Sequence, residues 1–498
     1  MSNLVDEVVC PSCWGVFDPA DVAWISRHPA LLGDVRLGPD AQERFLPSRF
    51  EARGFPLDAR DQVCSEVACP HCHLGLPRLF LEMRSLFVSV VGAPASGKSY
   101  FLGAAVHQLR SVTGERFRLG MVDADPERNS LILDYEKALF QQRSLDTLCD
   151  VGDLIRKTQF GDGAAGTFAA INHGGMTIHR PRPFSYRLET RPGHPAHGEA
   201  GAGDRILCLY DNAGESYLPT RQDPHAEEVT AHLAQSRFIL FVFDPLGDSR
   251  FLREARLQRQ DILPPKDLSG QYEVLAEAAR RVHQLRTGDR AAWPPLLVLV
   301  SKWDAWKELL PEVDMAEPIR PVSRSEVHGL DMERIERASD SLRALLARLC
   351  PNLVQTAESI GHEVRYLPVS ALGATPTTQP GKFRPPSPGD GGTPRPIEYI
   401  KASQIRPAWV TVPFLYGLAR FASKLVPKAD RKVERLDKVA KAEPKPPRGH
   451  GVPPPPTVGK PPATNGIPAT RGAPPAIGPS IFDDDDFPGG LIPPARKN

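Results

Sequence analysis

The chain has 498 residues, an apolar content of 41% and a formal net charge of +1. This length predicts two or three domains, and the near-zero charge argues neither for nor against nucleic acid or an anionic membrane as a partner. No apolar run reaches the roughly 18 residues that a membrane helix needs, and residues 1–7 lack the basic and then apolar pattern of a signal peptide. We therefore expect a cytoplasmic protein whose eight cysteines are metal ligands or core residues rather than disulfides.

Residues 1–82 hold five of these cysteines, four of them in two C-P-x-C turns. The turns are Cys10 to Cys13 and Cys69 to Cys72. Each turn points two thiolates at one metal, so the pair predicts a closed, structural Zn²⁺ site in a zinc-ribbon-like module. Cys64 or His73 are alternative ligands, and a redox C-x-x-C is an alternative function. The long stretch between the turns is interpreted as a small helical excursion. The module lacks a dense Lys/Arg patch, so we expect it to be structural or protein-binding rather than nucleic-acid-binding.

The middle of the chain, residues 84–425, alternates apolar runs with helical periodicity, which predicts an α/β domain. Six apolar runs predict strands, most of them continuous as in buried parallel strands, at 86–91, 184–189, 205–210, 238–243, 296–300 and 364–369. Helices are predicted at 99–112, 130–157, 273–285, 332–349 and 405–425, and a long loop at 373–396. The fold expected is a doubly wound, mostly parallel P-loop NTPase sheet with insertions at 113–182 and 373–398. The remaining cysteines, Cys149, Cys208 and Cys350, are predicted to lie in the core.

A phosphate-binding loop is predicted between the first strand and the first helix. The sequence Gly92-Ala93-Pro94-Ala95-Ser96-Gly97-Lys98-Ser99, followed by Tyr100, fits the pattern G-x-x-x-x-G-K-[ST]. The glycines let the backbone curl so that N–H groups face a phosphate, Lys98 places a positive charge there, and the Ser99 hydroxyl can ligate Mg²⁺. The strand, loop and helix context is the one that this pattern requires.

A second segment with phosphate chemistry follows the strand 205–210, where the chain reads Asp211-Asn212-Ala213-Gly214. An aspartate at the end of a buried strand is where a P-loop protein holds its Mg²⁺. Gly214 can bring a backbone N–H close to the γ-phosphate because it has no Cβ.

Two further segments point to the base. The strand 296–300 leads into Ser301-Lys302-Trp303-Asp304, where the carboxylate can accept hydrogen bonds from the N1–H and the amino group of guanine, while the stem of Lys302 stacks on the base. The strand 364–369 leads into Ser370-Ala371-Leu372, whose backbone amide can bond the guanine carbonyl. Adenine offers no such pair of donors, so the site is predicted to select GTP.

These four segments, in this order, resemble the Ras-like, translation-factor-related GTPases of the TRAFAC class. The resemblance covers residues 84 to about 425 and implies that Lys98 and Ser99 hold phosphate and Mg²⁺. It implies that Asp211 and Gly214 serve the γ-phosphate and its metal, that Lys302 and Asp304 select the base, and that Ser370 and Ala371 complete the base site. The activity implied is hydrolysis of GTP to GDP and phosphate, slow without a partner, in a Mg²⁺-dependent switch.

The chain departs from this family at several positions. Ser301 stands where Asn or Thr is usual, although a hydroxyl can still tie this segment to the phosphate loop. Glu215 follows Gly214 where Ras-like proteins carry glutamine; it could orient water, act as a base, repel the γ-phosphate or be a solvated switch residue. The second Mg²⁺ ligand is expected to be a threonine before the strand 184–189, with Thr177 preferred over Thr167 and Thr158.

The last part, residues 427–498, is rich in Pro, Gly, Lys and Ala and is predicted to be disordered. Near its end an acidic run between aromatics, 481–488, has the form of a docking motif, with a solubilising stretch as the alternative. A zinc module fused to an enlarged GTPase domain is similar to bacterial double-GTPase-type proteins of conflict systems. Protein effectors are expected at the switch loops, the zinc module or this tail. An ATP-using P-loop ATPase and a poorly hydrolysing nucleotide-binding scaffold are the alternative functions.

Overall fold

The computed structural model describes residues 4–142, 144–155, 168–199, 203–211, 217, 230–263, 270–285, 293–322, 325–361, 363–385 and 394–429. The chain divides into two compact units, Met1–Asp437 and Lys438–Asn498, and all described residues belong to the first. The predicted disordered tail lies outside the described residues from residue 430 onward. Within the described ranges, no helix has the length and apolar character needed to cross a membrane.

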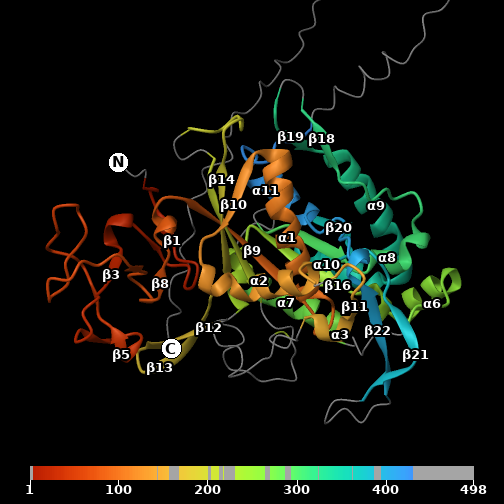
Figure 1. Ribbon diagram of the computed structural model, residues 1–498, viewed down its shortest axis with the longest axis horizontal. Helices are drawn as coiled ribbons and strands as arrows, with labels where there is room; N and C mark the ends of the chain where they lie inside the picture. The colour runs from red at the N-terminus through yellow and green to blue at the C-terminus, as the bar shows by residue number, and fades with distance from the viewer. Residues whose placement is uncertain are drawn as a thin grey trace, which may run out of the picture. The chain divides into compact units, whose positions relative to one another are not determined.

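A seven-stranded sheet forms the centre of the first unit. Its order is β10 (Leu119–Asp123), β14 (Phe184–Thr190), β15 (Arg205–Asp211), β9 (Arg84–Gly92), β16 (Phe238–Phe243), β17 (Leu296–Val300) and β20 (Val364–Pro368). Figure 1 shows β10 and β14 toward one edge and β20 toward the other. Strand β14 is antiparallel to both of its neighbours, and every other pair is parallel, so six strands run in one direction.

All six predicted strands are present, within two residues of their expected ends. The sheet was expected to be mostly parallel, and β14 is the exception, since it runs antiparallel to β15 with Phe184 opposite Leu209. Strand β10 is not evident in the sequence, because its five residues contain a glycine and only a short apolar run.

Both faces of the sheet are covered, which explains why its central strands read as continuous apolar runs. Along β16, Leu240 and Val242 join the core under α1 (Lys98–Phe117), α2 (Pro126–Phe140) and α11 (Val412–Phe421). The alternate residues Ile239, Phe241 and Phe243 join a second core with α6 (Ser249–Gln258), α7 (Gln271–Leu285) and α10 (Pro351–Ile360). Helix α9 (Met332–Leu349) contributes to both cores. Cys208 and Cys350 are fully buried and Cys149 is 6% exposed, so their predicted place in the core is confirmed.

The N-terminal residues form short strands rather than the predicted helical excursion. These strands are β1 (Val8–Val9), β2 (Val16–Phe17), β3 (Ala23–Ile25), β4 (Leu32–Asp34), β5 (Gly38–Gln42), β6 (Arg44–Phe45), β7 (Val67–Ala68) and β8 (Gly75–Leu76). Residues 14–68, all of them described, contain no α-helix, and their frequent Gly, Pro and Asp residues favour turns instead. The apolar side chains of this module pack on β9 and β15, against Phe87, Ile206, Cys208 and Tyr210.

The first insertion differs from the single long helix predicted for 130–157. Helix α2 begins earlier, at Pro126, because the Asp125 carboxylate accepts a hydrogen bond of 3.1 Å from the Arg128 amide and caps it. It ends at Phe140 and is followed by β11 (Leu148–Asp150) and α3 (Val151–Leu154). A hairpin of β12 (Phe168–His173) and β13 (Met176–Pro181) completes the described part of this insertion.

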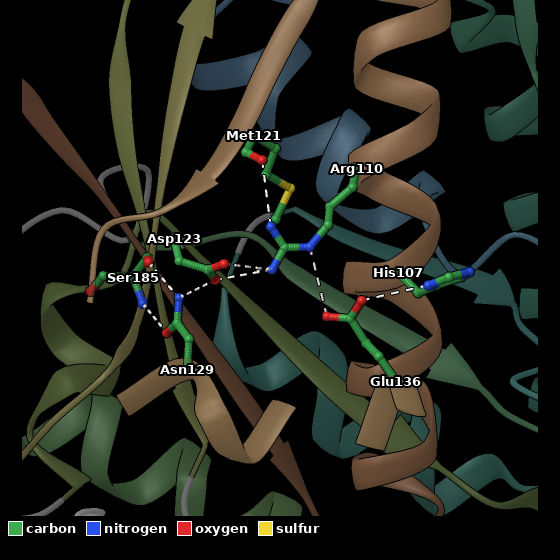
Figure 2. A network of polar contacts seen from close by, with 7 residues as sticks. All are labelled: His107, Arg110, Met121, Asp123, Asn129, Glu136 and Ser185. Atoms are coloured by element: carbon green, nitrogen blue, oxygen red, sulfur yellow. Dashed lines mark hydrogen bonds and ion pairs between the residues drawn. The ribbon is translucent and has the colours of Figure 1, made fainter. Parts of the chain in front are cut away.

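Polar side chains join this insertion to α1, as Figure 2 shows. Arg110 of α1 donates to both carboxylate oxygens of Asp123 at 3.0 and 3.2 Å, and its Nε lies 3.7 Å from Glu136 of α2. The amide of Asn129 bridges Asp123 and the backbone of Ser185, with three contacts of 2.8 to 3.0 Å. These contacts fix β10 and α2 against the helix that begins at Lys98.

The second insertion contains an antiparallel strand pair where the sequence predicts a loop at 373–396. Strand β22 (Arg395–Lys401) lies between β21 (Thr377–Arg384) and β11 and pairs with both in a three-stranded antiparallel sheet. The strand β21 is exposed along nearly its whole length and contains Pro-Gly, so it lacks the apolar alternation that marks a strand in sequence. The last helix, α11, is shorter than the predicted 405–425 and begins next to Pro413.

Candidate functional site

The loop between β9 and α1 turns through two residues in the left-handed region of backbone angles. Ala95 and Gly97 have positive φ angles of 64° and 94°, and Gly97 precedes the first turn of the 20-residue helix α1. A Cβ on Gly92 would lie 2.8 Å from Ser96 Oγ and 3.0 Å from the carbonyl oxygen of Val242, so only glycine fits there. The loop therefore presents the N-terminus of a long helix, with its unpaired N–H groups, at the end of the central strand.

Lys98 and Asp211 face each other at the carboxyl ends of the central strands. Strands β9 and β15 are parallel, with Asp211 opposite Val90, so their carboxyl ends lie side by side. The Nζ atom of Lys98 lies 2.7 Å from Oδ1 of Asp211, and the two side chains are only 10% and 4% exposed. Ser99 is half-buried beside them. The next residue, Tyr100, donates its hydroxyl to the carbonyl of Val151, and burial raises the pKa of this phenol to about 12.

The segment 301–304 lies against the same loop. The Ser301 hydroxyl donates a hydrogen bond of 3.4 Å to the carbonyl of Ser96, which is the contact that the sequence allowed for this serine. Lys302 adopts a left-handed conformation with a φ of 57° and starts the short helix α8 (Trp303–Trp306). Its Nζ lies 2.6 Å from Oδ2 of Asp244, a fully buried carboxylate at the end of β16. Asp244 was missed in the sequence, although its place after an apolar strand resembles that of Asp211.

The carboxylate of Asp304 is held by two hydroxyls from the segment after β20. Ser370 Oγ donates to Asp304 Oδ1, and Thr375 Oγ1 donates to Oδ2 at 3.1 Å. Ser370 itself is fixed by backbone hydrogen bonds with Ala408, at 3.0 and 2.9 Å. Ala371 and Leu372 are half-buried and pack on the core under α1. Side-chain contacts thus link several segments at the carboxyl ends of the strands. They join Lys98 to Asp211, Ser301 to Ser96, and Asp304 to Ser370.

The site also lies near the point where the strand order of the sheet reverses. From β9 the chain forms β14 and β15 on one side of it and then crosses to β16, β17 and β20 on the other side. In open α/β sheets, ligands bind outside the carboxyl ends of the strands where the strand order reverses in this way. The loop 92–99 follows β9 and Asp211 is the last residue of the neighbouring β15, while Asp304 follows β17, one strand beyond β16.

The predicted switch residues are placed less completely. Gly214, Glu215, Thr158 and Thr167 lie outside the described residues. Thr177 is exposed on the β12–β13 hairpin, opposite Asn172. The hairpin contacts the N-terminal module, since the Asn172 amide donates to the carbonyl of Arg36 at 2.6 Å and Ile171 packs in the module's core. The role of Thr177 as a Mg²⁺ ligand stays a prediction.

The four cysteines of the two C-P-x-C turns converge. Their sulfur atoms lie within 4.8 Å of one another, with Cys10 to Cys72 at 3.8 Å and Cys13 to Cys69 at 3.7 Å. A tetrahedral Zn²⁺ site with Zn–S bonds of about 2.3 Å has sulfur atoms about 3.8 Å apart, so the donor set fits this ion. Backbone amides within the turns donate to Cys10 and Cys69 at 3.4 Å, as expected for sulfurs that carry negative charge.

The alternative ligands face elsewhere. Cys64 is buried and donates to the carbonyl of Gln62 at 3.5 Å. His73 Nδ1 lies 2.7 Å from the Asp34 carboxylate, and His71 Nε2 contacts the carbonyl of Val16 at 3.1 Å. The metal-ligand set supported by the geometry is therefore the four-cysteine set.

The cysteine module contacts β15 next to Asp211. The Tyr210 hydroxyl donates to the carbonyl of Pro11 at 2.7 Å and accepts from Trp14 Nε1 at 3.1 Å. The Tyr210 ring stacks on His232, with ring centres 4.7 Å apart, and His232 Nδ1 lies 2.5 Å from Ser89 Oγ on β9. Burial lowers the pKa of His232 to about 3, helped by the positive charges of Arg281 and Lys98, so this ring is neutral at neutral pH.

Comparisons with known proteins find a similar sequence but show no family. No family model matches the chain. It is 28% identical over 317 residues to SaeC of Mycolicibacterium smegmatis, a protein provisionally named an ESX-1 scaffolding and assembly protein; the match covers 60% of this chain and 71% of SaeC. A crystal structure of a Thermus thermophilus protein shares 11% identity over 58% of this chain and 37% of its own, with a TM-score of 0.20, and the chain thus spans about a third of that protein.

Proposed function

We propose that this chain is a GTP-binding protein of the Ras-like P-loop class that hydrolyses GTP to GDP and phosphate and acts as a Mg²⁺-dependent switch. The observation that carries the proposal is the position of the Asp304 carboxylate. This carboxylate accepts a hydrogen bond from Ser370, in the segment after β20. Ser301, three residues before Asp304 in the chain, is hydrogen-bonded to Ser96 in the loop 92–99. A base recognised by Asp304 and a phosphate chain held by that loop would then belong to one nucleotide.

The phosphate end of the site has the groups that a triphosphate needs. The backbone N–H groups at the start of α1 and the Nζ of Lys98 supply positive charge, and Ser99 with Asp211 would hold Mg²⁺, which neutralises charge on the β- and γ-phosphates. In the structure Lys98 is paired with Asp211. We infer that nucleotide binding breaks this pair, because the lysine then turns to phosphate and the aspartate to the metal.

The water-activating group remains a prediction. Gly214 and Glu215 follow Asp211 in the chain and lie outside the described residues. If Glu215 orients the attacking water, Glu215→Ala should lose turnover while Glu215→Gln retains part of it. If both variants and the wild type show equal, near-zero rates, the protein is a scaffold that binds nucleotide without hydrolysing it.

This scaffold is the second candidate function, and the similarity to SaeC favours it. That protein is named for scaffolding and assembly. On this reading GTP would set the conformation in which the chain binds protein partners through its switch loops, cysteine module or acidic tail, in the cytoplasm. The four cysteines would hold a structural Zn²⁺ that keeps the module folded. An ATP-using P-loop ATPase is less well supported, because the pair of Asp304 and Ser370 suits guanine.

Nucleotide competition tests the proposal. We expect the wild type to prefer GTP to ATP and to XTP, and Asp304→Asn to shift toward XTP, because an amide can donate to the 2-oxo group of xanthine. Glu308→Gln is the matched control, since this exposed carboxylate lies four residues further along the chain. Equal binding of GTP and ATP by the wild type, unchanged in Asp304→Asn, would rule out the guanine site.

A further inference from the structure

We propose that Thr375 and Arg259 position the Asp304 carboxylate and thereby set how strongly the site selects guanine. This inference rests on the proposed function and adds to it two positioning residues outside the four sequence segments. We call Arg259, Thr375 and Asp304 the carboxylate clamp. Its members come from three places in the chain: the residue after α6, the segment after β20, and α8.

The first observation is that both oxygens of Asp304 are engaged. Ser370 donates to Oδ1, and Thr375 donates to Oδ2 at 3.1 Å. Each carboxylate oxygen can accept two hydrogen bonds, so each keeps capacity for one donor from a bound base. The two hydroxyls thus fix the rotation of the carboxylate without using up its acceptors.

The second observation is that Arg259 holds the other end of this arrangement. Its Nη1 donates to Thr375 Oγ1 at 3.0 Å and to the main-chain carbonyl of Asp304 at 3.1 Å. Accepting from Arg259 leaves the single hydroxyl proton of Thr375 free to point at Asp304. The guanidinium is itself oriented by Asp261, through contacts of 3.0 and 3.3 Å. The side chain and the backbone of Asp304 are therefore tied to the same arginine.

Such a clamp matters for selectivity because guanine presents two donors, the N1–H and the 2-amino group, to one planar carboxylate. A carboxylate free to rotate must be ordered when the base binds, and this ordering lowers affinity. A carboxylate already held in one plane keeps both bonds strong. Loss of the clamp should therefore lower the affinity for nucleotides that use both donors more than the affinity for those that use one or none.

Binding affinities for three nucleotides can distinguish this role from general support of the fold. GTP offers both donors, ITP lacks the 2-amino group, and ATP lacks both. For Thr375→Val, which removes the hydroxyl at nearly constant volume, we expect GTP affinity to fall about 5- to 10-fold, in line with the net contribution of one hydrogen bond. ITP affinity should fall less, so that the preference for GTP over ITP drops several-fold, and ATP affinity should not change.

Matched variants complete the experiment, which uses the full chain and equilibrium binding of each nucleotide. Thr375→Ser keeps the hydroxyl and should restore the preference, and Thr377→Val changes an exposed threonine two residues away and should have no effect. Arg259→Gln should act in the same direction as Thr375→Val, and the double variant should add little because the two residues act as a unit. If Thr375→Val does not fold, Thr375→Ser and Arg259→Gln carry the comparison.

The outcomes distinguish this inference from the proposed function. A wild type without preference for GTP over ATP contradicts the guanine site itself. A GTP-selective wild type whose ratio of GTP to ITP affinity is unchanged in both Thr375→Val and Arg259→Gln overturns the clamp alone. Equal losses for GTP, ITP and ATP would also overturn it, because they would mean that the two residues only support the fold.

Discussion

The hydroxyl of Tyr210 donates a hydrogen bond of 2.7 Å to the carbonyl of Pro11, inside the first C-P-x-C turn. Tyr210 is the last residue of β15 before Asp211, and Pro11 follows the metal-ligand candidate Cys10. The cysteine module and the strand that carries Asp211 are therefore in direct polar contact. A change in the folding of the turn must alter the surroundings of β15.

Removing this contact should destabilise the protein measurably. Tyr210→Phe keeps the ring but leaves the carbonyl of Pro11 and the Nε1–H of Trp14 without their partner, and a buried group left unpaired costs about 1–3 kcal/mol. We expect a loss of this size in the free energy of unfolding, measured by denaturant titration. Tyr186→Phe is the control, since the buried Tyr186 hydroxyl has no hydrogen-bond partner among the described residues and its removal should cost little. Equal effects in the two variants would contradict the importance of the contact.

The zinc assignment predicts one metal ion per chain and a specific set of ligands. We expect Cys69→Ser to lose the ion, measured by elemental analysis of the purified full chain, and to unfold at a lower temperature because metal binding contributes to folding. Cys64→Ser should retain it, because this buried thiol lies outside the four-sulfur cluster. A wild type purified without zinc, and unable to bind it when it is added, would show that the thiols serve another purpose.

The sequence predicted the parts of the candidate site that depend on strand ends. Lys98 and Asp211 were assigned to phosphate and Mg²⁺ because each comes at the end of an apolar strand, and the structure brings them together because the carboxyl ends of the neighbouring parallel strands β9 and β15 lie side by side. The same reasoning brought Asp304 close to Ser370. It also gave the four cysteines, because the spacing of each turn is a local property.

The sequence could not predict contacts between positions without a local pattern. Arg259 and Thr375 are 116 positions apart, and each looks like an ordinary surface residue. Tyr210 reads as one more apolar strand residue, although its hydroxyl reaches the cysteine module. Strand β14 looked like the parallel strands of the sheet because both of its faces are largely buried, and direction leaves no trace in composition. The β21–β22 strand pair was missed because its exposed residues show no alternation.

The N-terminal module should be sensitive to acid through Asp58. This carboxylate, 1% exposed, accepts hydrogen bonds from the backbone amides of Arg27, His28, Arg60 and Gln62, at 2.9 to 3.1 Å. Burial raises the pKa of Asp58, but these four amides outweigh it, so the pKa lies below its usual value. The stabilisation is therefore complete above the pKa of the unfolded chain, near 3.9, and is lost as the pH falls through the lower folded pKa.

A pH series on Asp58→Asn checks this expectation. At pH 7 the variant should be less stable than the wild type by about 2 kcal/mol, because an amide cannot replace the charged acceptor of four N–H groups. The difference should shrink below about pH 4, where the wild-type carboxylate becomes protonated as well. Asp61→Asn is the control, since this carboxylate is largely exposed. A stability difference that stays constant from pH 7 to pH 3 would contradict the role of charge.

The close packing around Gly92 gives the last prediction. A methyl group there would lie 3.0 Å from the Val242 carbonyl of β16 and 2.8 Å from Ser96 Oγ, and the backbone of a central strand cannot move away. Gly92→Ala should therefore lower stability by about 1–3 kcal/mol and distort the loop that precedes Lys98. Because the loop supplies the proposed phosphate contacts, affinity for GTP and for inorganic triphosphate should fall together, measured by calorimetry at a temperature where the variant is folded. Gly361→Ala is the control, since a Cβ there meets its nearest neighbour, the Pro294 carbonyl, at an ordinary 3.5 Å. Unchanged binding in a folded Gly92→Ala variant would show that the loop does not hold the phosphates.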